Sequence, residues 1–229
     1  MKRTTRMTAM LGVTLLALTA ASASSQDRGK GPGKMNHAQM DKMMSSWPRA
    51  SKQAAMFMTK KYGPPAAMTS EMAIWGKTGP WKRTVVYGKE YPHEFPAHHT
   101  DVMQQWVDYK ALPEMYDELA AYDGSVVLER TSGEISARCD KEEANFLALN
   151  LADEIVRGKR SVEDARKMYG EQIMKMKAKQ PAPYTEKLMF TPMMGTGDPD
   201  HALAMSGMTG ARDAQRYAAD RLVLSPRKP

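Results

Sequence analysis

Residues 125–156 read SVVLERTSGEISARCDKEEANFLALNLADEIV, a stretch that predicts a β-hairpin followed directly by a helix. After the turn, Ile135, Ala137 and Cys139 alternate with polar residues, a period of two that is typical of a strand with one buried face. Between residues 141 and 156 the apolar residues instead recur at helical spacing. A helix with one apolar stripe is buried by packing on a sheet, so this stretch predicts an α+β fold in which Cys139 is buried.

The rest of the chain alternates between helical and strand-like patterns. Helical spacing of apolar residues predicts further helices, and short runs of β-branched and aromatic residues predict strands. The expected helices span residues 49–62, 113–122 and 161–179, the expected strands span residues 72–75 and 82–87, residues 88–100 are expected to form a loop, and residues 101–110 a strand or a short helix. The predicted fold class is α+β: a small antiparallel sheet of two hairpins packed against about four helices, with extended N- and C-terminal arms.

Residues 1–23 have the three regions of a secretory signal peptide. The basic residues Lys2, Arg3 and Arg6 precede an uncharged, largely apolar run, and Ala21-Ser22-Ala23 supplies the small residues of a cleavage site. We therefore expect cleavage near residue 24 and an exported protein, periplasmic or extracellular. The uncharged run approaches the roughly 20 residues that span a bilayer, so a retained membrane anchor is the alternative.

The remaining length fits one domain with a flanking arm on each side. Residues 24–46 are expected to form a flexible, Met-containing arm, and residues 47–179 the globular α+β domain. Residues 180–229 are rich in Pro, Gly and Met and are expected to form a C-terminal arm with few core contacts. We expect no membrane-spanning segment once the signal peptide is removed.

Charge and motifs exclude several functional classes. The chain has 229 residues, one Cys and a formal net charge of +7. Loss of residues 1–23, which carry three basic residues and no acidic ones, lowers the charge to +4, too mild to indicate nucleic-acid binding. A single Cys excludes a disulfide within the chain, and the sequence has no Walker loop, dinucleotide-binding GxGxxG or GxSxG nucleophile motif.

Four segments carry a resemblance to a known group of proteins: GPWKRTVVY (79–87), FPAHHTDV (95–102), YDELAAYDGSVVLERTSGEISARCDKEEANFLALNLADEIV (116–156) and SVEDARKMY (161–169). The region of about residues 47–169 resembles a family of uncharacterised exported bacterial proteins. The resemblance implies export and carries over no activity and no functional residue. The Met-rich flanks lie outside it.

Two clusters of His and Met are candidate copper ligands. His37, Met40 and Met44 share one face of an expected helix, and His201, Met205 and Met208 form a second set near the C-terminus. The thioether of Met is a soft, neutral ligand that suits Cu(I). Met is also a flexible core residue and an adaptable contact for protein partners, so packing and partner binding are the alternatives.

A second candidate metal site lies in the expected loop, where His93, His98, His99 and Asp101 cluster. Imidazole and carboxylate ligands suit Zn²⁺ or Cu²⁺. His98 and His99 point to opposite sides of an extended chain, so at most one of them joins His93. The spacing of His93 and His98 misses the zinc-protease helix motif by one residue, and Pro96 breaks any helix there. The alternative is that these His side chains hydrogen-bond to backbone in a structured loop.

The function that we expect from the sequence is that of an exported, non-enzymatic interaction protein. A compact core between two extended Met-rich arms suits an extrinsic or scaffold subunit of a larger envelope or membrane complex, with a protein partner and no cofactor. Two alternatives remain open: a periplasmic Cu(I)-binding protein that uses the Met and His clusters, and an enzyme that uses the His-rich loop.

Overall fold

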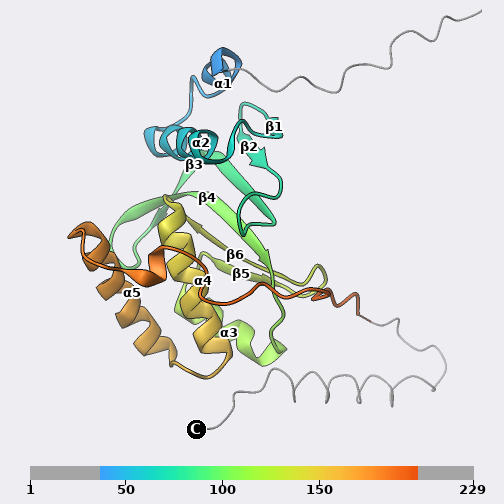
Figure 1. The fold of residues 1–229 in the computed structure, drawn as a ribbon, viewed down its shortest axis with the longest axis vertical. Helices are drawn as coiled ribbons and strands as arrows, with labels where there is room; N and C mark the ends of the chain where they lie inside the picture. Colours follow the sequence, from blue (N-terminus) through green and yellow to red (C-terminus); the bar gives the residue numbers. More distant parts are fainter. Residues whose placement is uncertain (1–36, 201–229) are drawn as a thin grey trace, which may run out of the picture. The chain divides into compact units, whose positions relative to one another are not determined.

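The computed structural model describes residues 37–200, which fold into helices packed on one antiparallel sheet (Figure 1). The expected signal peptide, the start of the N-terminal arm, and His201, Met205 and Met208 lie outside the described residues. The elements in chain order are α1 (His37–Met43), α2 (Arg49–Tyr62), β1 (Ala67–Met68), β2 (Met72–Trp75), β3 (Arg83–His93), β4 (His99–Asp108), a 3₁₀ turn (Pro113–Met115), α3 (Tyr116–Tyr122), β5 (Val126–Glu129), β6 (Glu134–Cys139), α4 (Glu142–Val156), α5 (Val162–Lys177) and a second 3₁₀ turn (Pro183–Thr185). No helix within this range has the length and hydropathy of a membrane crossing.

The described strands form a six-stranded antiparallel sheet in the order β1-β2-β3-β4-β6-β5, so the predicted α+β class is confirmed. Gln105 on β4 shows that α2 and α4 cover the same face of this sheet. Its side-chain nitrogen approaches the sulfur of Met58 on α2, and its side-chain oxygen accepts a hydrogen bond from Asn145 on α4. Helix α5 packs on α4, outside the first layer (Figure 1).

The sheet differs from the expectation between residues 88 and 100, where the predicted loop is mostly strand. Strand β3 continues to His93 and β4 already begins at His99, so only five residues connect them. Pro92 and Pro96 suggested a loop because Pro usually interrupts strands. The register of β3 against β4 shifts after Val86, and beyond Tyr87 β3 has only β4 as a neighbour. An edge strand with a bulge can contain both Gly and Pro, so β3 continues through Gly88 and Pro92.

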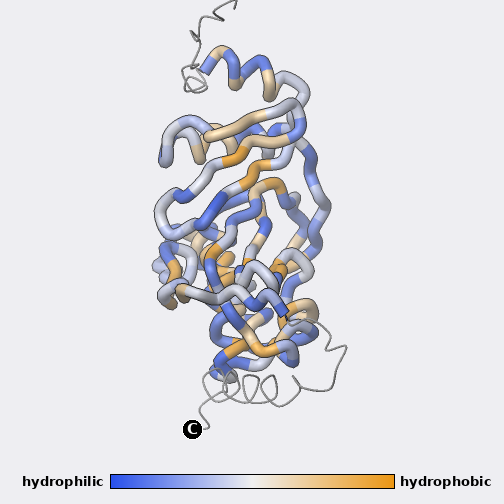
Figure 2. Tube along the Cα trace, turned by 90° about the vertical axis from the view of Figure 1, so that its right-hand side faces the viewer, coloured by the Kyte–Doolittle hydropathy of each residue, from blue (hydrophilic) through white to orange (hydrophobic). Residues whose placement is uncertain are grey.

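Two hydrophobic clusters fill the space between helices and sheet, and in Figure 2 the hydrophobic segments gather in the middle of the described chain. The larger cluster joins α3, α4 and α5 to the β4–β6–β5 end, with Trp81, Tyr109, Tyr122, Leu147 and Leu151 among its most buried members. The smaller cluster joins α1 and α2 to the β2–β3–β4 end through Met40, Met44, Trp47, Met58, Trp75 and Met103. Met40 and Met44, which were expected to lie in a flexible arm, are therefore part of the core.

A buried carboxylate, Glu142 in the first turn of α4, connects the two clusters. Its side chain is 1% exposed and pairs with Lys61 of α2. It also accepts hydrogen bonds from Tyr62 Oη at 2.8 Å and from Trp81 Nε1 at 2.7 Å. A buried carboxylate is tolerated only when donors satisfy its oxygens, as they do here, and the helix N-terminus adds to its stabilisation. Glu142 therefore fixes α4 against α2.

The segment after α5 is extended, as expected, but it packs on the domain. Asn150 of α4 donates to the carbonyl oxygens of Tyr184 and Lys187 and accepts from the Met189 backbone N–H. Further along, the buried Thr196 hydroxyl donates to the Gly133 carbonyl in the β5–β6 turn. The expectation of few core contacts does not hold for residues 182–198, because polar groups of α4 and the hairpin turn satisfy its backbone.

Candidate metal centre

The β3–β4 hairpin brings two imidazoles together at its closed end. His93 is the last residue of β3 and His99 the first of β4, and the two are paired directly across the ladder. Asp101 follows His99 by two residues in the same strand. Side chains two apart in a strand point to the same face, so Asp101 joins the pair on the helix-covered side of the sheet. The ring centroids of His93 and His99 are 4.9 Å apart.

The ligating atoms of His93, His99 and Asp101 all lie within 4.8 Å of one another. His99 Nε2 is 3.2 Å from Asp101 Oδ1, and His93 Nδ1 is 3.4 Å from Asp101 Oδ2. The His side chains are 19% and 20% exposed, whereas Asp101 is 1% exposed. The carboxylate thus forms the floor of the cluster, and the two imidazoles lie between it and solvent.

The contacts between Asp101 and the two imidazoles are ion-pair contacts that lack hydrogen-bond geometry. Among the described residues, His93 Nδ1, His99 Nε2 and Asp101 Oδ1 have no hydrogen-bond partner. A buried polar atom without a hydrogen-bond partner lowers the stability of the fold by about 1–3 kcal/mol. Three such atoms lie close together here, which requires a physical explanation. A metal ion supplies one, because two nitrogens and one oxygen are a typical donor set for Zn²⁺, Fe²⁺ and similar divalent ions.

A second layer of groups holds the three residues in place. His99 Nδ1 lies 2.9 Å from the Ala97 carbonyl oxygen, and His93 Nε2 lies 3.7 Å from Asp123 Oδ1. The Ser125 hydroxyl donates to Asp101 Oδ2. Ligating imidazoles in metal sites usually direct their other ring nitrogen at a carbonyl or a carboxylate in this way, which fixes the ring and leaves one nitrogen for the metal.

Electrostatics within the cluster keep Asp101 ionised despite its burial. Burial alone would raise the pKa of Asp101, but His99, Ser125 and His93 together lower it below its usual value. The Asp101 carboxylate, with a smaller contribution from Cys139, raises the pKa of His99 to about 11. Burial raises the pKa of Asp123. Because metal ligands bind in their deprotonated form, metal binding at His99 would be favoured by rising pH.

Cys139 lies next to this cluster on β6. It is a buried free thiol, as predicted from the alternation of its strand, and burial raises its pKa. Together with His99 and Tyr169 it lines a small pocket of about 160 Å³, to which Lys141 and Lys177 also contribute. A buried thiol with a raised pKa is a poor nucleophile, so the geometry does not favour covalent catalysis by Cys139.

His98 lies apart from the cluster; the sequence predicted that at most one of His98 and His99 joins His93. Its side chain is 77% exposed and its Nδ1 lies 2.8 Å from Glu94 Oε1. Sequence reasoning identified His93, His99 and Asp101 but missed Asp123 and Ser125, which precede β5. The order of strands in the sheet brings these two residues to His93 and Asp101, and no local sequence pattern predicts that contact.

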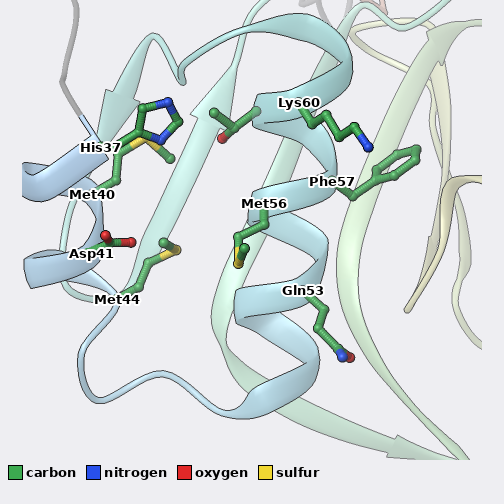
Figure 3. Close-up of a pocket in the computed structure, with 9 residues that line it drawn as sticks. His37, Met40, Asp41, Met44, Gln53, Met56, Phe57 and Lys60 are labelled. Carbon is green, nitrogen blue, oxygen red and sulfur yellow. The ribbon is translucent and has the colours of Figure 1, made fainter.

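The predicted N-terminal His and Met cluster lies elsewhere, between α1 and α2. His37, Met40 and Met44 line a pocket of about 740 Å³ with Met56 and other residues of α2 (Figure 3). Met40 is 2% and Met44 4% exposed. The pocket is separate from the β3–β4 cluster, because none of its lining residues belongs to that hairpin.

Comparison of the chain with protein-family models, with curated proteins and with solved structures gave no match. A function for this chain is therefore inferred from its sequence and from the geometry of the described residues.

Proposed function

We propose that this is an exported protein that binds one divalent transition-metal ion at His93, His99 and Asp101. One observation carries the proposal: three ligand atoms from a hairpin end converge within 4.8 Å of one another. The same three atoms are buried and have no hydrogen-bond partner among residues 37–200. Export rests on the sequence of residues 1–23, with its basic start, apolar run and small-residue cleavage site.

The donor set favours Zn²⁺ as the first ion to test. Zn²⁺ accepts imidazole nitrogen and carboxylate oxygen at about 2.0–2.2 Å and needs no fixed geometry from its electrons. Three protein ligands leave a coordination position for water or another group, as in sites that are not purely structural. A closed four-ligand site is not formed by the atoms that converge here.

The neighbouring pair His98 and His99 provides a matched test. Zn²⁺ added to metal-free protein should bind with one ion per chain in calorimetry and should raise the melting temperature. His99→Ala should weaken binding by about tenfold or more, because it removes one of three donors. His98→Ala should bind like the wild type, since its side chain is 77% exposed and lies outside the cluster.

Equal affinities of the His98→Ala and His99→Ala proteins would contradict the proposal. Thermal unfolding of both metal-free variants shows whether either substitution disturbs the fold, so a folding defect is not mistaken for lost binding.

A second proposed function is that of an interaction protein in a larger envelope complex. It rests on the composition of the two flanking segments, most of which lie outside the described residues. The converging ligand atoms are a more specific observation, so we place metal binding first.

A further inference from the structure

The pocket between α1 and α2 gathers three Met side chains from two helices (Figure 3). Met40 belongs to α1, Met44 directly follows this helix, and Met56 comes from α2. In Figure 3 the side-chain ends of Met44 and Met56 point toward one another, and the His37 ring lies next to Met40. Met56 belongs to none of the His and Met clusters visible in the sequence, and only the packing of the helices brings it here.

Packing explains Met40 and Met44 but not Met56. The first two belong to the smaller core cluster, which holds their side chains in place. Met56 is 62% exposed, although covering its side chain would be favourable by about 1.5–3 kcal/mol. Met43, the residue before Met44, is 36% exposed and does not line the pocket. The exposed thioether of Met56 thus faces that of Met44, in a pocket that Met40 also lines (Figure 3).

We propose that this pocket binds Cu(I) through the thioether sulfurs of Met40, Met44 and Met56. Thioethers are soft, uncharged donors that suit Cu(I) and are poor ligands for Zn²⁺. Asp41 also lines the pocket and supplies a negative charge for a monovalent cation. Lys60 lines it as well, but in Figure 3 its ammonium group points away from His37 and Met40. This site shares no residue with the divalent centre in the β3–β4 hairpin and stands independently of it.

Met56 lines the pocket and Met43 does not, so substitutions of these two residues form a matched pair. Met56→Leu and Met43→Leu both replace an exposed Met by a residue of similar volume, so neither should change folding. Only the first removes a pocket sulfur. Met44→Leu removes a buried sulfur of the same pocket and tests the site from the residue that follows α1.

The experiment is anaerobic titration of Cu(I) into the protein against bicinchoninate, a coloured Cu(I) chelator. The wild type and Met43→Leu should withdraw Cu(I) from the chelator with equal strength. Met56→Leu and Met44→Leu should each bind about tenfold or more weakly, because each keeps only two of three thioethers. An excess of Zn²⁺ should leave Cu(I) binding unchanged, and so should His99→Ala.

Two results would overturn the proposal. One is a wild-type protein that takes no Cu(I) from the chelator. The other is a Met56→Leu protein that binds Cu(I) as tightly as Met43→Leu, which would place any bound copper on other residues. Neither result bears on the divalent centre, whose test uses Zn²⁺ and His99.

Discussion

His99 Nε2 lies 3.2 Å from Asp101 Oδ1, yet neither atom has a hydrogen-bond partner among the described residues. The two residues are adjacent on one face of β4, and His93 reaches the same point from the paired end of β3. The hairpin fixes the positions of the two imidazoles and the carboxylate that we propose as metal ligands. Metal binding should therefore need little rearrangement of the backbone.

The layer behind the ligands should control affinity without touching the ion. Asp123→Asn keeps the size of the side chain but removes the charge that faces His93 Nε2. We expect metal affinity to fall about 10–100-fold, as is typical for loss of such a partner. Calorimetry with Zn²⁺ checks this, and Asp117→Asn, on the exposed side of α3, is the control. An unchanged affinity in Asp123→Asn would mean that the His93 ring is held by other contacts.

Replacement of the buried carboxylate at the start of α4 should destabilise the whole domain. Glu142→Gln removes the charge that Lys61 pairs with and places an amide N–H₂ among the donors of Tyr62 and Trp81. We expect the free energy of unfolding to fall by about 2 kcal/mol or more. Urea unfolding measures it, with Glu143→Gln as the control. Equal losses in both variants would show that Glu142 does not join the two clusters.

Acid should selectively weaken the contact between Glu134 and its basic partners. Hydrogen bonds from Arg83 are the largest cause that holds the pKa of Glu134 below its usual 4.5, and Lys82 adds to them. A pKa lowered on folding stabilises the fold above pH 4.5, and this contribution is lost as pH falls through the lowered value. Wild type should therefore exceed Glu134→Gln in stability at neutral pH, and the gap should shrink in acid. A constant gap in urea unfolding across this range would refute the account.

The segment after α5 should depend on one side chain of α4. Asn150→Ala removes both donors to Tyr184 and Lys187 and the acceptor for the Met189 N–H. We expect a loss of about 1–3 kcal/mol in unfolding free energy and faster proteolysis within residues 183–198. Glu186→Ala, an exposed change in the same segment, serves as the control. Unchanged proteolysis in Asn150→Ala would mean that the other contacts of the segment suffice.

Local patterns predicted the elements that have a strong period of their own. The alternation through residues 134–139 gave the strand and the buried Cys139, and the spacing in residues 49–62 gave α2 with its observed bounds. The pattern failed in residues 88–100, where Pro92 and Pro96 suggested a loop. Gly88 has a packing role there, because a Cβ at that position would lie 2.7 Å from Trp47 Nε1, a contact far away in sequence.

The residues of the candidate sites likewise fall into those that local sequence predicts and those that only tertiary packing brings together. Sequence reasoning found His93, His99 and Asp101 because they are close along the chain and their spacing restricts which side chains share a face. It did not find Asp123, Ser125 or Met56, since each arrives through tertiary packing. Ser125 is 24 residues from Asp101 along the chain, and nothing in its local pattern marks it as a contact.

The most direct measurement is the position of Zn²⁺ in crystals of the metal-loaded protein, located by anomalous diffraction at the zinc edge. We predict a peak at about 2.0–2.2 Å from a ring nitrogen of His93, a ring nitrogen of His99 and a carboxylate oxygen of Asp101. A well-occupied peak elsewhere on the chain, with no density between these three residues, would contradict the assignment of the metal centre.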